Sequence, residues 1–448
     1  MSFRLAERSA WAHLQVRERL LLRLYRGLTG ILPSRVIIAA LRTRAARHPH
    51  REDAAQVPER LAIDLAPRPA GTLIWLHAIG PGDATALLPL IRAFLAHDPA
   101  VICLITTRTA SGKAVFARLG ESARVITQLA PLDTRAAIKR FLAHWKPGLA
   151  VFGEGDMWPN TMELLKARDI PVALVNAQMN GRLGKLCRKQ PRFAHWMHAH
   201  VDFVHVFPEQ DSPSAQSLFR QDCKVVGAPN LKLDAPSLTV SAAIINSINA
   251  QWGGAPVLTC ASVSNREVPV LLEAARLVRA QLPEFRLILV PRWTDQAEEM
   301  AELVRASRAQ FSRRSVDKVP KPGDQVFITD TYGEMGNWIE CSFAVFMGNT
   351  LFGGHGHNPF EPISQQRVIL AGGIPHLLQA DYQYLVDLGL CHVAGDAQAI
   401  ADTALRLWQG RGQSDNPAAP LESARGFAAR IATDLCDLAC IPASKRAV

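Results

Sequence analysis

Short apolar segments alternate with amphipathic helical segments along this chain, and this alternation restricts the fold more than any other feature. In the first half, strands are expected at residues 72–78, 101–106, 149–152 and 172–175, with helices at 84–96, 134–145 and 159–168. Strands that alternate with helices form a parallel sheet with crossover helices. The sequence therefore predicts an α/β fold.

The second half repeats the pattern. Strands are expected at residues 256–260, 286–290, 326–329, 343–347 and 367–371, and a helix at 267–281. A proline-containing polar stretch at residues 227–238 is the best linker, so two α/β halves are expected to join near residue 235. Ligands of such sheets bind beyond the carboxyl ends of the strands, and a cleft between the halves is the natural site.

The composition is that of an ordinary soluble protein, with 48% apolar and 20% charged residues among 448. That length is enough for two or three domains. Eight cysteines are scattered without zinc spacing or a disulfide framework, which indicates a reducing cytoplasm.

The basic charge lies almost entirely in one segment. Residues 1–51 hold eleven arginines and two glutamates, a net charge of +9 out of the chain's +10. Arg23, Arg26 and Arg35 interrupt each apolar run, which argues against a transmembrane span. The segment is typical of a basic amphipathic helix on an anionic membrane surface, with a solvated helix or docking arm as the alternative. A nucleic-acid partner is not expected, because the folded body carries little net charge.

A glycine-rich stretch at residues 342–362 follows the pattern of strand, loop and helix N-terminus. Its glycines are Gly348, Gly353, Gly354 and Gly356. Asn358 suits an N-cap, Pro359 the first helical position and Glu361 a capping box. The free N–H groups of such a turn favour a phosphate, although a well-capped βα turn is the plain alternative. His355 and His357 have no third partner, so a metal site is not expected.

Four further candidates follow predicted strands. Asp83 suits a general base or, alternatively, a helix N-cap. Glu154 and Asp156 suit catalysis, the binding of hydroxyl groups or helix capping. Arg292 suits phosphate recognition or a surface ion pair. The residues Thr331-Tyr332-Gly333-Glu334 place a glycine where a ligand can approach.

Taken in order, these motifs resemble the 3-deoxy-D-manno-octulosonic acid (Kdo) transferases of lipopolysaccharide assembly, from about Arg51 to the end of the second half. The motifs that carry the resemblance are Glu154-Gly-Asp-Met-Trp-Pro-Asn160, Leu287-Ile-Leu-Val-Pro-Arg292, Asp330-Thr-Tyr-Gly-Glu-Met335 and Gly354-His-Gly-His-Asn-Pro-Phe-Glu-Pro362. Three departures are notable. Asp83 stands where the family has a catalytic Glu, Asn176-Ala-Gln-Met-Asn180 lacks the family's Arg, and Asn265-Arg-Glu267 replaces Gly-Glu-Glu.

The resemblance implies a GT-B glycosyltransferase fold with two Rossmann-like domains that face a cleft. It divides the chain into a membrane-associating segment at 1–50, an acceptor domain at 51–235 and a CMP-sugar domain at 236–448. CMP-binding residues would be Pro291, Arg292, Tyr332, Gly333, Glu334, Asn358, Pro359, Phe360 and Glu361. Glu154, Asp156 and Asn176 would lie on the acceptor side.

The expected activity is transfer of Kdo, or a related acid sugar, from CMP-Kdo to a lipid A precursor on the cytoplasmic face of the inner membrane. Asp83 would act as the base, and Arg292 with the amides of residues 348–358 would stabilise the departing CMP. The scheme uses no metal or cofactor. The alternatives are a GT-B transferase or epimerase with another sugar or acceptor, and an inactive membrane scaffold that keeps the donor motifs.

Overall fold

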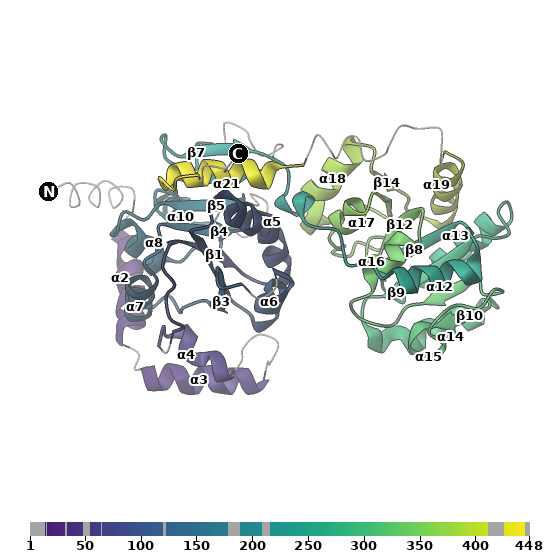
Figure 1. The fold of residues 1–448 in the computed structure, drawn as a ribbon, viewed down its shortest axis with the longest axis horizontal. Coiled ribbons are helices and arrows are strands. Elements are labelled where there is room, and N and C mark those ends of the chain that lie inside the picture. Colours follow the sequence, from purple (N-terminus) through teal and green to yellow (C-terminus); the bar gives the residue numbers. More distant parts are fainter. Residues whose placement is uncertain are drawn as a thin grey trace. The chain divides into compact units, whose positions relative to one another are not determined.

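The computed structural model divides the chain into two compact units. The first contains residues 1–235 and 426–448, and the second contains residues 236–425. Within these ranges the structure describes residues 14, 16–31, 34–47, 54–63, 65–119, 122–177, 189–207, 216–410 and 425–443. Each unit is built on one seven-stranded parallel sheet (Figure 1).

The first sheet has the strand order β3-β2-β1-β4-β5-β6-β7, and every neighbouring pair is parallel. Its strands are β1 (Thr72–Ala78), β2 (Val101–Thr107), β3 (Val125–Leu129), β4 (Leu149–Gly153), β5 (Val172–Ala177), β6 (Phe203–Val206) and β7 (Lys224–Gly227). The order reverses between β1 and β4. This reversal leaves a crevice at the carboxyl ends of these two strands, where doubly wound sheets bind ligands.

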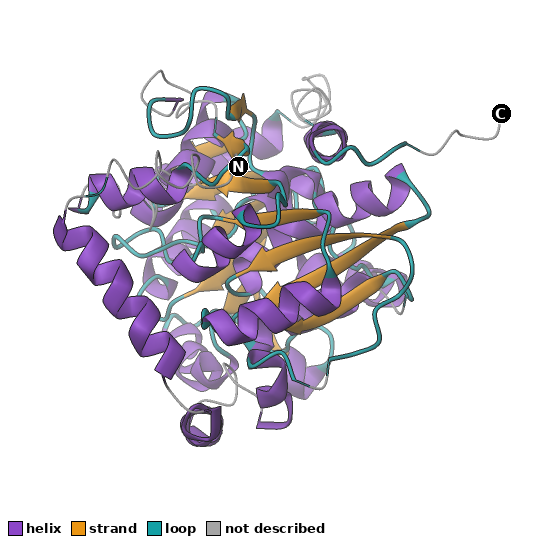
Figure 2. Cartoon of the chain, turned by 90° about the vertical axis from the view of Figure 1, so that its left-hand side faces the viewer, coloured by secondary structure: helices purple, strands orange, loops and turns teal. Residues whose placement is uncertain are grey.

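Helices cover both faces of this sheet, because the β1 side chains alternate between two apolar cores. Leu73 and Trp75 join one core with α7 (Arg135–Trp145), α8 (Pro159–Lys166) and α10 (Pro191–His198). Ile74 and Leu76 join the other core with α5 (Pro81–His97) and α21 (Phe427–Leu438). Figure 2 shows purple helices packed over the orange strands. Short helices α4 (Val57–Arg60) and α6 (Ala110–Val115), with 3₁₀ turns η1 (Ala54–Gln56), η2 (Phe116–Leu119) and η4 (Leu231–Asp234), complete the unit.

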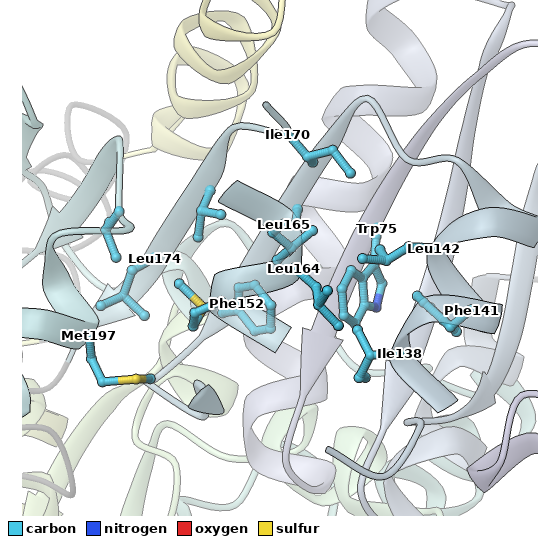
Figure 3. Close-up of a cluster of buried hydrophobic side chains, with 14 of the residues drawn as sticks. Trp75, Ile138, Phe141, Leu142, Phe152, Leu164, Leu165, Ile170, Leu174 and Met197 are labelled. Carbon is cyan, nitrogen blue, oxygen red and sulfur yellow. The ribbon is translucent and has the colours of Figure 1, made fainter. Parts of the chain in front are cut away.

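Trp75 is the centre of the first core. Its ring lies 4.7 Å from that of Phe141 on α7 and 5.3 Å from that of Phe152 on β4 (Figure 3). Its indole N–H donates to the Thr106 hydroxyl at 2.8 Å, so the buried polar atom is satisfied. The packing holds β1, β2 and β4 in one layer next to the crevice.

The N-terminal basic segment contributes two helices, α2 (Val16–Ile31) and α3 (Ser34–Arg47), and α2 is docked on the first unit. Leu22 is 3% exposed within the core that contains Trp75. The Tyr25 hydroxyl donates to Asp133 at 2.8 Å, and Arg26 pairs with Glu163 at 2.5 Å. The rest of the predicted 1–50 segment, residues 1–13, 15, 32–33 and 48–50, lies outside the described residues.

The second sheet has the order β10-β11-β9-β8-β12-β13-β14, which reverses between β8 and β12. Its strands are β8 (Val257–Val263), β9 (Arg286–Pro291), β10 (Phe311–Arg313), β11 (Val326–Ile328), β12 (Ala344–Met347), β13 (Val368–Ala371) and β14 (Cys391–Val393). Its helices are α12 (Ala242–Trp252), α13 (Val268–Arg279), α14 (Ala297–Ala306), α15 (Arg314–Asp317), α16 (Met335–Glu340), α17 (Phe360–Ser364), α18 (Gln379–Asp387) and α19 (Ala397–Gln409), with η5 (Thr294–Gln296) and η6 (His376–Leu378). One face packs on α13, α14 and α19, and the other on α12 and α16.

The predicted α/β class with two Rossmann-like parallel-sheet halves is confirmed. One domain limit differs from the prediction, because residues 426–448 belong to the first unit and not to a 236–448 domain. The reason is the apolar face of α21, whose Ile431 and Leu435 join the core formed with α5. No helix among the described residues is long and apolar enough to cross a bilayer.

Candidate functional site

Asp83 lies in the first turn of α5, directly after β1. The helix begins at Pro81 with Gly80 as its N-cap, so the expected alternative of an Asp83 N-cap is wrong by three residues. The carboxylate accepts a hydrogen bond from the Ile79 N–H at 3.2 Å and remains half-buried. This bond holds Asp83 at the amino end of α5 with part of its side chain open to solvent, where the N-terminal helix dipole favours a carboxylate.

Asp156 closes the crevice between β1 and β4 from the β4 side. Its carboxylate lies 3.1 Å from His77 Nε2 at the end of β1 and accepts from Arg108 at 3.2 Å. The other ring nitrogen of His77 lies 2.9 Å from the Thr106 hydroxyl. Burial raises the pKa of Asp156, but the hydrogen bond and charge of His77, with Arg108 and Trp158, outweigh it and lower the pKa below its ordinary value. Asp156 is therefore ionised at neutral pH and organises two basic side chains.

Arg108 links this network to the Glu154–Asn160 motif. Its guanidinium lies over the Trp158 ring, 5.4 Å from the centroid, and about a third of the side chain is exposed. Asn160 faces inward instead. It is fully buried, and its amide nitrogen donates to the Asp133 carbonyl at 2.6 Å and to the Thr29 hydroxyl of α2 at 3.2 Å. Asn160 thus supports the docking of α2.

Glu154 and Asn176 differ in what they offer a ligand. Glu154 is part-exposed, and its carboxylate lies 3.9 Å from the Lys232 ammonium. Asn176 is fully buried, and its side chain donates to Asn230 at 2.8 Å and accepts from the Leu231 N–H at 3.0 Å. Because these bonds use both ends of the amide inside the unit, we leave Asn176 out of the candidate site. Gln178, Met179 and Asn180 of the same motif lie outside the described residues.

Arg292 follows β9 at the carboxyl edge of the second sheet. Its guanidinium is exposed and stacks on Trp293, 4.6 Å from the ring centroid. Within the described part of the chain no carboxylate pairs with it, so the surface ion pair considered as an alternative is not found. Pro291 before it is buried as the last residue of β9 and positions Arg292 through the backbone. An exposed guanidinium with a supporting ring is well suited to an anionic ligand.

Tyr332, Gly333 and Glu334 form the turn after β11. Tyr332 is 73% exposed, and Gly333 has a φ of +82°, a conformation that favours glycine. Glu334 is already engaged, because Arg314 donates to both of its carboxylate oxygens, at 3.0 and 2.5 Å, and the Thr331 hydroxyl also donates. The hydrogen bond from Arg314 is the main reason that the pKa of Glu334 is lowered.

Glu267 controls the glycine-rich loop, and this role was not predicted. Its side chain is 1% exposed. It accepts from the backbone N–H groups of Asn349, Thr350 and Leu351 at 2.7, 2.9 and 3.2 Å, and also from the N–H and hydroxyl of Ser264. The prediction that the amides throughout 348–358 serve a phosphate is therefore wrong for residues 349–351, because an internal carboxylate already occupies them.

Close backbone packing explains two of the loop glycines. A Cβ on Gly348 would lie 2.5 Å from the backbone of Val263, where β12 ends against β8. Gly356 has a φ of +63°, and a Cβ there would lie 2.4 Å from the Pro375 ring. These glycines fix the path of the loop by allowing close contact with the neighbouring chain.

The turn into α17 begins one residue later than predicted. The N-cap is Pro359, and the Asn358 side chain accepts from the Phe360 N–H at 3.2 Å. Pro359 and Phe360 are buried, so their side chains shape the turn and do not present a surface to a ligand. Asn358 and Glu361 remain half-buried at this edge. The helix has only five residues, too short for the dipole-based phosphate site that the sequence predicted.

His357 is a second residue that sequence reasoning set aside. Burial and the nearby charge of Arg292 lower the pKa of His357 to about 4, so its ring is neutral at pH 7. Its Nε2 is buried and has no hydrogen-bond partner among the described residues. A neutral ring nitrogen near Arg292 and Glu267 can bond a ligand hydroxyl. The described residues contain no group of three or more His, Cys, Asp or Glu side chains that could hold a metal ion.

Similarity to solved structures defines the class of fold. A UDP-N-acetylglucosamine 2-epimerase from Neisseria meningitidis aligns with a TM-score of 0.54 and 14% identity, over 82% of this chain and 100% of that one. A glycosyltransferase from Rickettsia africae aligns with a TM-score of 0.51 and 11% identity, over 83% and 98%. The fold is therefore that of the GT-B glycosyltransferases.

Sequence comparison finds a more specific similarity. Residues 55–235 match the model described as 3-deoxy-D-manno-octulosonic-acid transferase (kdotransferase). The chain is 28% identical to the 3-deoxy-D-manno-octulosonic acid transferase of Haemophilus influenzae over 75% of this chain and 78% of the relative. It is 27% identical to that of Bordetella pertussis over 76% and 81%. The resemblance to the Kdo transferases is thus confirmed, and it supports a glycosyltransferase.

Proposed function

We propose that this protein transfers Kdo, or a related acid sugar, from CMP-Kdo to a lipid A precursor at the cytoplasmic face of the inner membrane. The observation that carries the proposal is the placement of the motifs shared with the Kdo transferases. Asp83, Glu154 and Asp156 lie at the carboxyl edge of one sheet, and Arg292, Glu334 and the 348–361 loop lie at that edge of the other. In doubly wound sheets this edge binds substrates.

On the donor side, Arg292 pairs with the phosphate of CMP-Kdo. The exposed guanidinium supports this role, and Trp293 restricts its movement. Charge builds up on the phosphate oxygen as the bond to the sugar breaks, and a fixed cation stabilises that charge. The Glu361 carboxylate accepts hydrogen bonds from hydroxyl groups of the ribose or sugar, and the neutral ring of His357 bonds such a hydroxyl group through Nε2. Glu267 keeps the loop in place without contacting the donor.

On the acceptor side, Asp83 removes the proton from the attacking hydroxyl. A bond then forms between that oxygen and the anomeric carbon, while the bond between the anomeric carbon and the CMP phosphate oxygen breaks. The Ile79 N–H fixes one carboxylate oxygen at 3.2 Å. Since a carboxylate has several acceptor positions, the Asp83 carboxylate can hold this bond and still accept a proton. His77, Asp156 and Arg108 form the adjacent polar wall.

The membrane surface is contacted by α2. Leu20, Leu24 and Leu28 are spaced by four residues and are 55%, 53% and 67% exposed, while Leu22 on another face is buried in the core. Arg17 and Arg23 on the same helix are exposed. An exposed leucine stripe with flanking arginines is typical of a helix lying on an anionic bilayer, where each arginine contributes about 1 kcal/mol.

Co-sedimentation with anionic liposomes tests this contact. Leu24→Glu with Leu28→Glu should lower the bound fraction severalfold, because two charges then face the acyl region. Val316→Glu is the matched control, since Val316 is 67% exposed in the second unit and should leave binding unchanged. Equal sedimentation of the double variant and the wild type would show that α2 does not contact the membrane.

Incubation with CMP-Kdo and a lipid A precursor tests the activity. CMP release together with a matching mass increase of the lipid is the expected result. Asp83→Asn should lower turnover roughly 100- to 10,000-fold while CMP affinity stays unchanged, because a general base contributes on that scale. Asp83→Glu should keep activity. Turnover of Asp83→Asn at the wild-type rate would make Glu154 the next candidate base, and CMP binding by a wild type that transfers nothing would favour a scaffold.

A further inference from the structure

A cavity of about 520 Å³ lies in the first unit, lined by α2, α3 and the carboxyl edge of the sheet. Its size is within the roughly 300–1,000 Å³ typical of sites for small ligands. The residues that line it come from β1, β4, the end of β2, the loop at residues 130–134, the start of α8, α4 and the two N-terminal helices. The proposed general base Asp83 is not among them, but His77 and Arg108 of the polar wall beside it are, so the cavity adjoins the proposed acceptor side.

Apolar side chains form most of the cavity wall. From α3, Val36, Ile37, Ala40 and Leu41 line it, a spacing that places all four on one helix face. Aromatic rings of Trp75, Phe152 and Trp158 line it from the sheet side. Such a wall binds apolar ligands through the area that both remove from water.

The polar groups in the wall already have partners within the unit. His77 and Arg108 both bond Asp156. Asp133 accepts from Tyr25 at 2.8 Å and from the Thr161 hydroxyl at 2.6 Å. Because these groups are engaged and most of the remaining wall is apolar, the cavity is suited to a hydrocarbon chain, with Arg44 and Arg60 as further charged residues of its lining.

The cavity communicates with the outside along α3. Val36 lines it and is nevertheless 54% exposed. The neighbouring helix α2 turns Tyr25 and Thr29 toward the cavity and carries Leu24 and Leu28 on its exposed surface. The same helix thus presents leucines to solvent and lines the cavity with Tyr25 and Thr29.

We propose that this cavity binds one acyl chain of an amphipathic lipid. The leucine stripe of α2 brings the unit to a lipid surface, and one chain enters between α3 and the sheet. Identification of that lipid as the sugar acceptor rests on the proposed function, whereas the binding of an acyl chain does not. If the lipid is the acceptor, the cavity fixes how deeply the lipid inserts and thus the position of the lipid's reacting hydroxyl group.

Photo-crosslinking with a diazirine-bearing palmitic acid below its micelle concentration tests the site directly. The full-length wild type should be labelled in peptides that contain α3 and Trp158. Ala40→Trp should occupy part of the cavity. Each methylene that no longer fits weakens binding roughly fourfold, so the loss of room for two or three methylenes predicts a half-saturating concentration roughly 15- to 60-fold higher.

Ala39→Trp is the matched control, since Ala39 and Ala40 are both exposed on the same helix but only Ala40 lines the cavity. It should label like the wild type. Ala40→Leu, a smaller insertion, should give an intermediate shift and guards against a misfolded Trp variant, with circular dichroism as the check on folding. Equal labelling of the wild type and both Ala40 variants, or label found only on α2, would overturn the proposal.

Competition experiments then distinguish the two lipids that could supply the acyl chain. Displacement of the probe by an acylated lipid A precursor, together with a raised KM and unchanged kcat in Ala40→Trp, identifies the acceptor. Displacement only by phosphatidylglycerol identifies a bilayer lipid and supports the cavity equally. Absence of sugar transfer with intact labelling would refute the proposed activity and leave the acyl site standing.

Discussion

Both units contain a seven-stranded parallel sheet whose strand order reverses at the centre, but they close their switch-point crevices in opposite ways. In the first unit, a carboxylate that follows the second of the two central strands, Asp156 after β4, reaches back to side chains at the ends of β1 and β2. In the second unit, a carboxylate that follows the first central strand, Glu267 after β8, reaches forward to three backbone amides after β12. The first contact depends on basic side chains and the second on the main chain.

This difference separates a rigid site from an adaptable one. Backbone amides do not titrate and cannot turn away, so Glu267 fixes the loop next to Arg292 and His357. Arg108 is part-exposed and stacked on Trp158, so the crevice of the first unit has a movable side chain at its edge. In the proposed reaction, the fixed loop would hold the nucleotide donor, and the adjustable wall would face the lipid acceptor.

The largest expected effect is on the second unit. Glu267→Ala leaves three loop amides without their acceptor, and hydrogen bonds to charged groups contribute roughly 1.5–3 kcal/mol each before relaxation. We expect a loss on the order of 4 kcal/mol in the free energy of unfolding of this unit, measured by urea denaturation. Glu273→Ala on the same helix is the control and should leave the free energy of unfolding nearly unchanged, because Glu273 is exposed. A loss as small as the control's would show that Glu267 does not hold the loop.

The central strands were predictable from the sequence because each is a continuous apolar run between turn residues. The prediction missed β3, β6, β7, β10 and β14, which have three to five residues. Several of these are interrupted by polar or charged side chains, such as His205 in β6 and Lys224 in β7. Their strand conformation comes from pairing with a neighbour, which local pattern does not reveal.

The candidate site likewise has residues that the sequence predicted and contacts that it did not predict. Residues directly after strands, such as Asp83, Asp156 and Arg292, were predictable because topology brings strand ends to one edge. The pairs that organise the site were not, since His77 and Asp156 are 79 residues apart and Glu267 and Asn349 are 82 apart. The Asn265-Arg-Glu267 motif offered a clue to the role of Glu267. It keeps one carboxylate of the family's Gly-Glu-Glu motif at the start of a helix.

The second prediction concerns the charge beside the fixed loop. Arg292→Ala should weaken CMP binding by roughly 1.5–3 kcal/mol, measured by calorimetric titration, because a charge-assisted bond to the phosphate is lost. Arg276→Ala is the control, since Arg276 is exposed and paired with Glu273. Arg266, which lies over the Phe352 ring at 5.2 Å, is the competing cation. A larger loss of CMP affinity for Arg266→Ala than for Arg292→Ala would indicate that the phosphate binds on the β8 side of the loop.

The smallest effect is expected in the first unit and depends on pH. The pKa of Asp156 is lowered in the folded protein, so its contribution is present above the ordinary carboxyl pKa of 3.8 and is lost as the pH falls through the lower folded value. Asp156→Asn should therefore reduce the free energy of unfolding of the first unit at pH 7 by on the order of 1.5 kcal/mol, near the low end for bonds to charged groups because Arg108 is part-exposed. The difference between variant and wild type should shrink below pH 4.

Asp222→Asn is the control, because its carboxylate is 77% exposed in the same unit. A difference that stays constant down to pH 2 would mean that Asp156 acts through packing, and the contrast between a titrating crevice and a main-chain crevice would then fail.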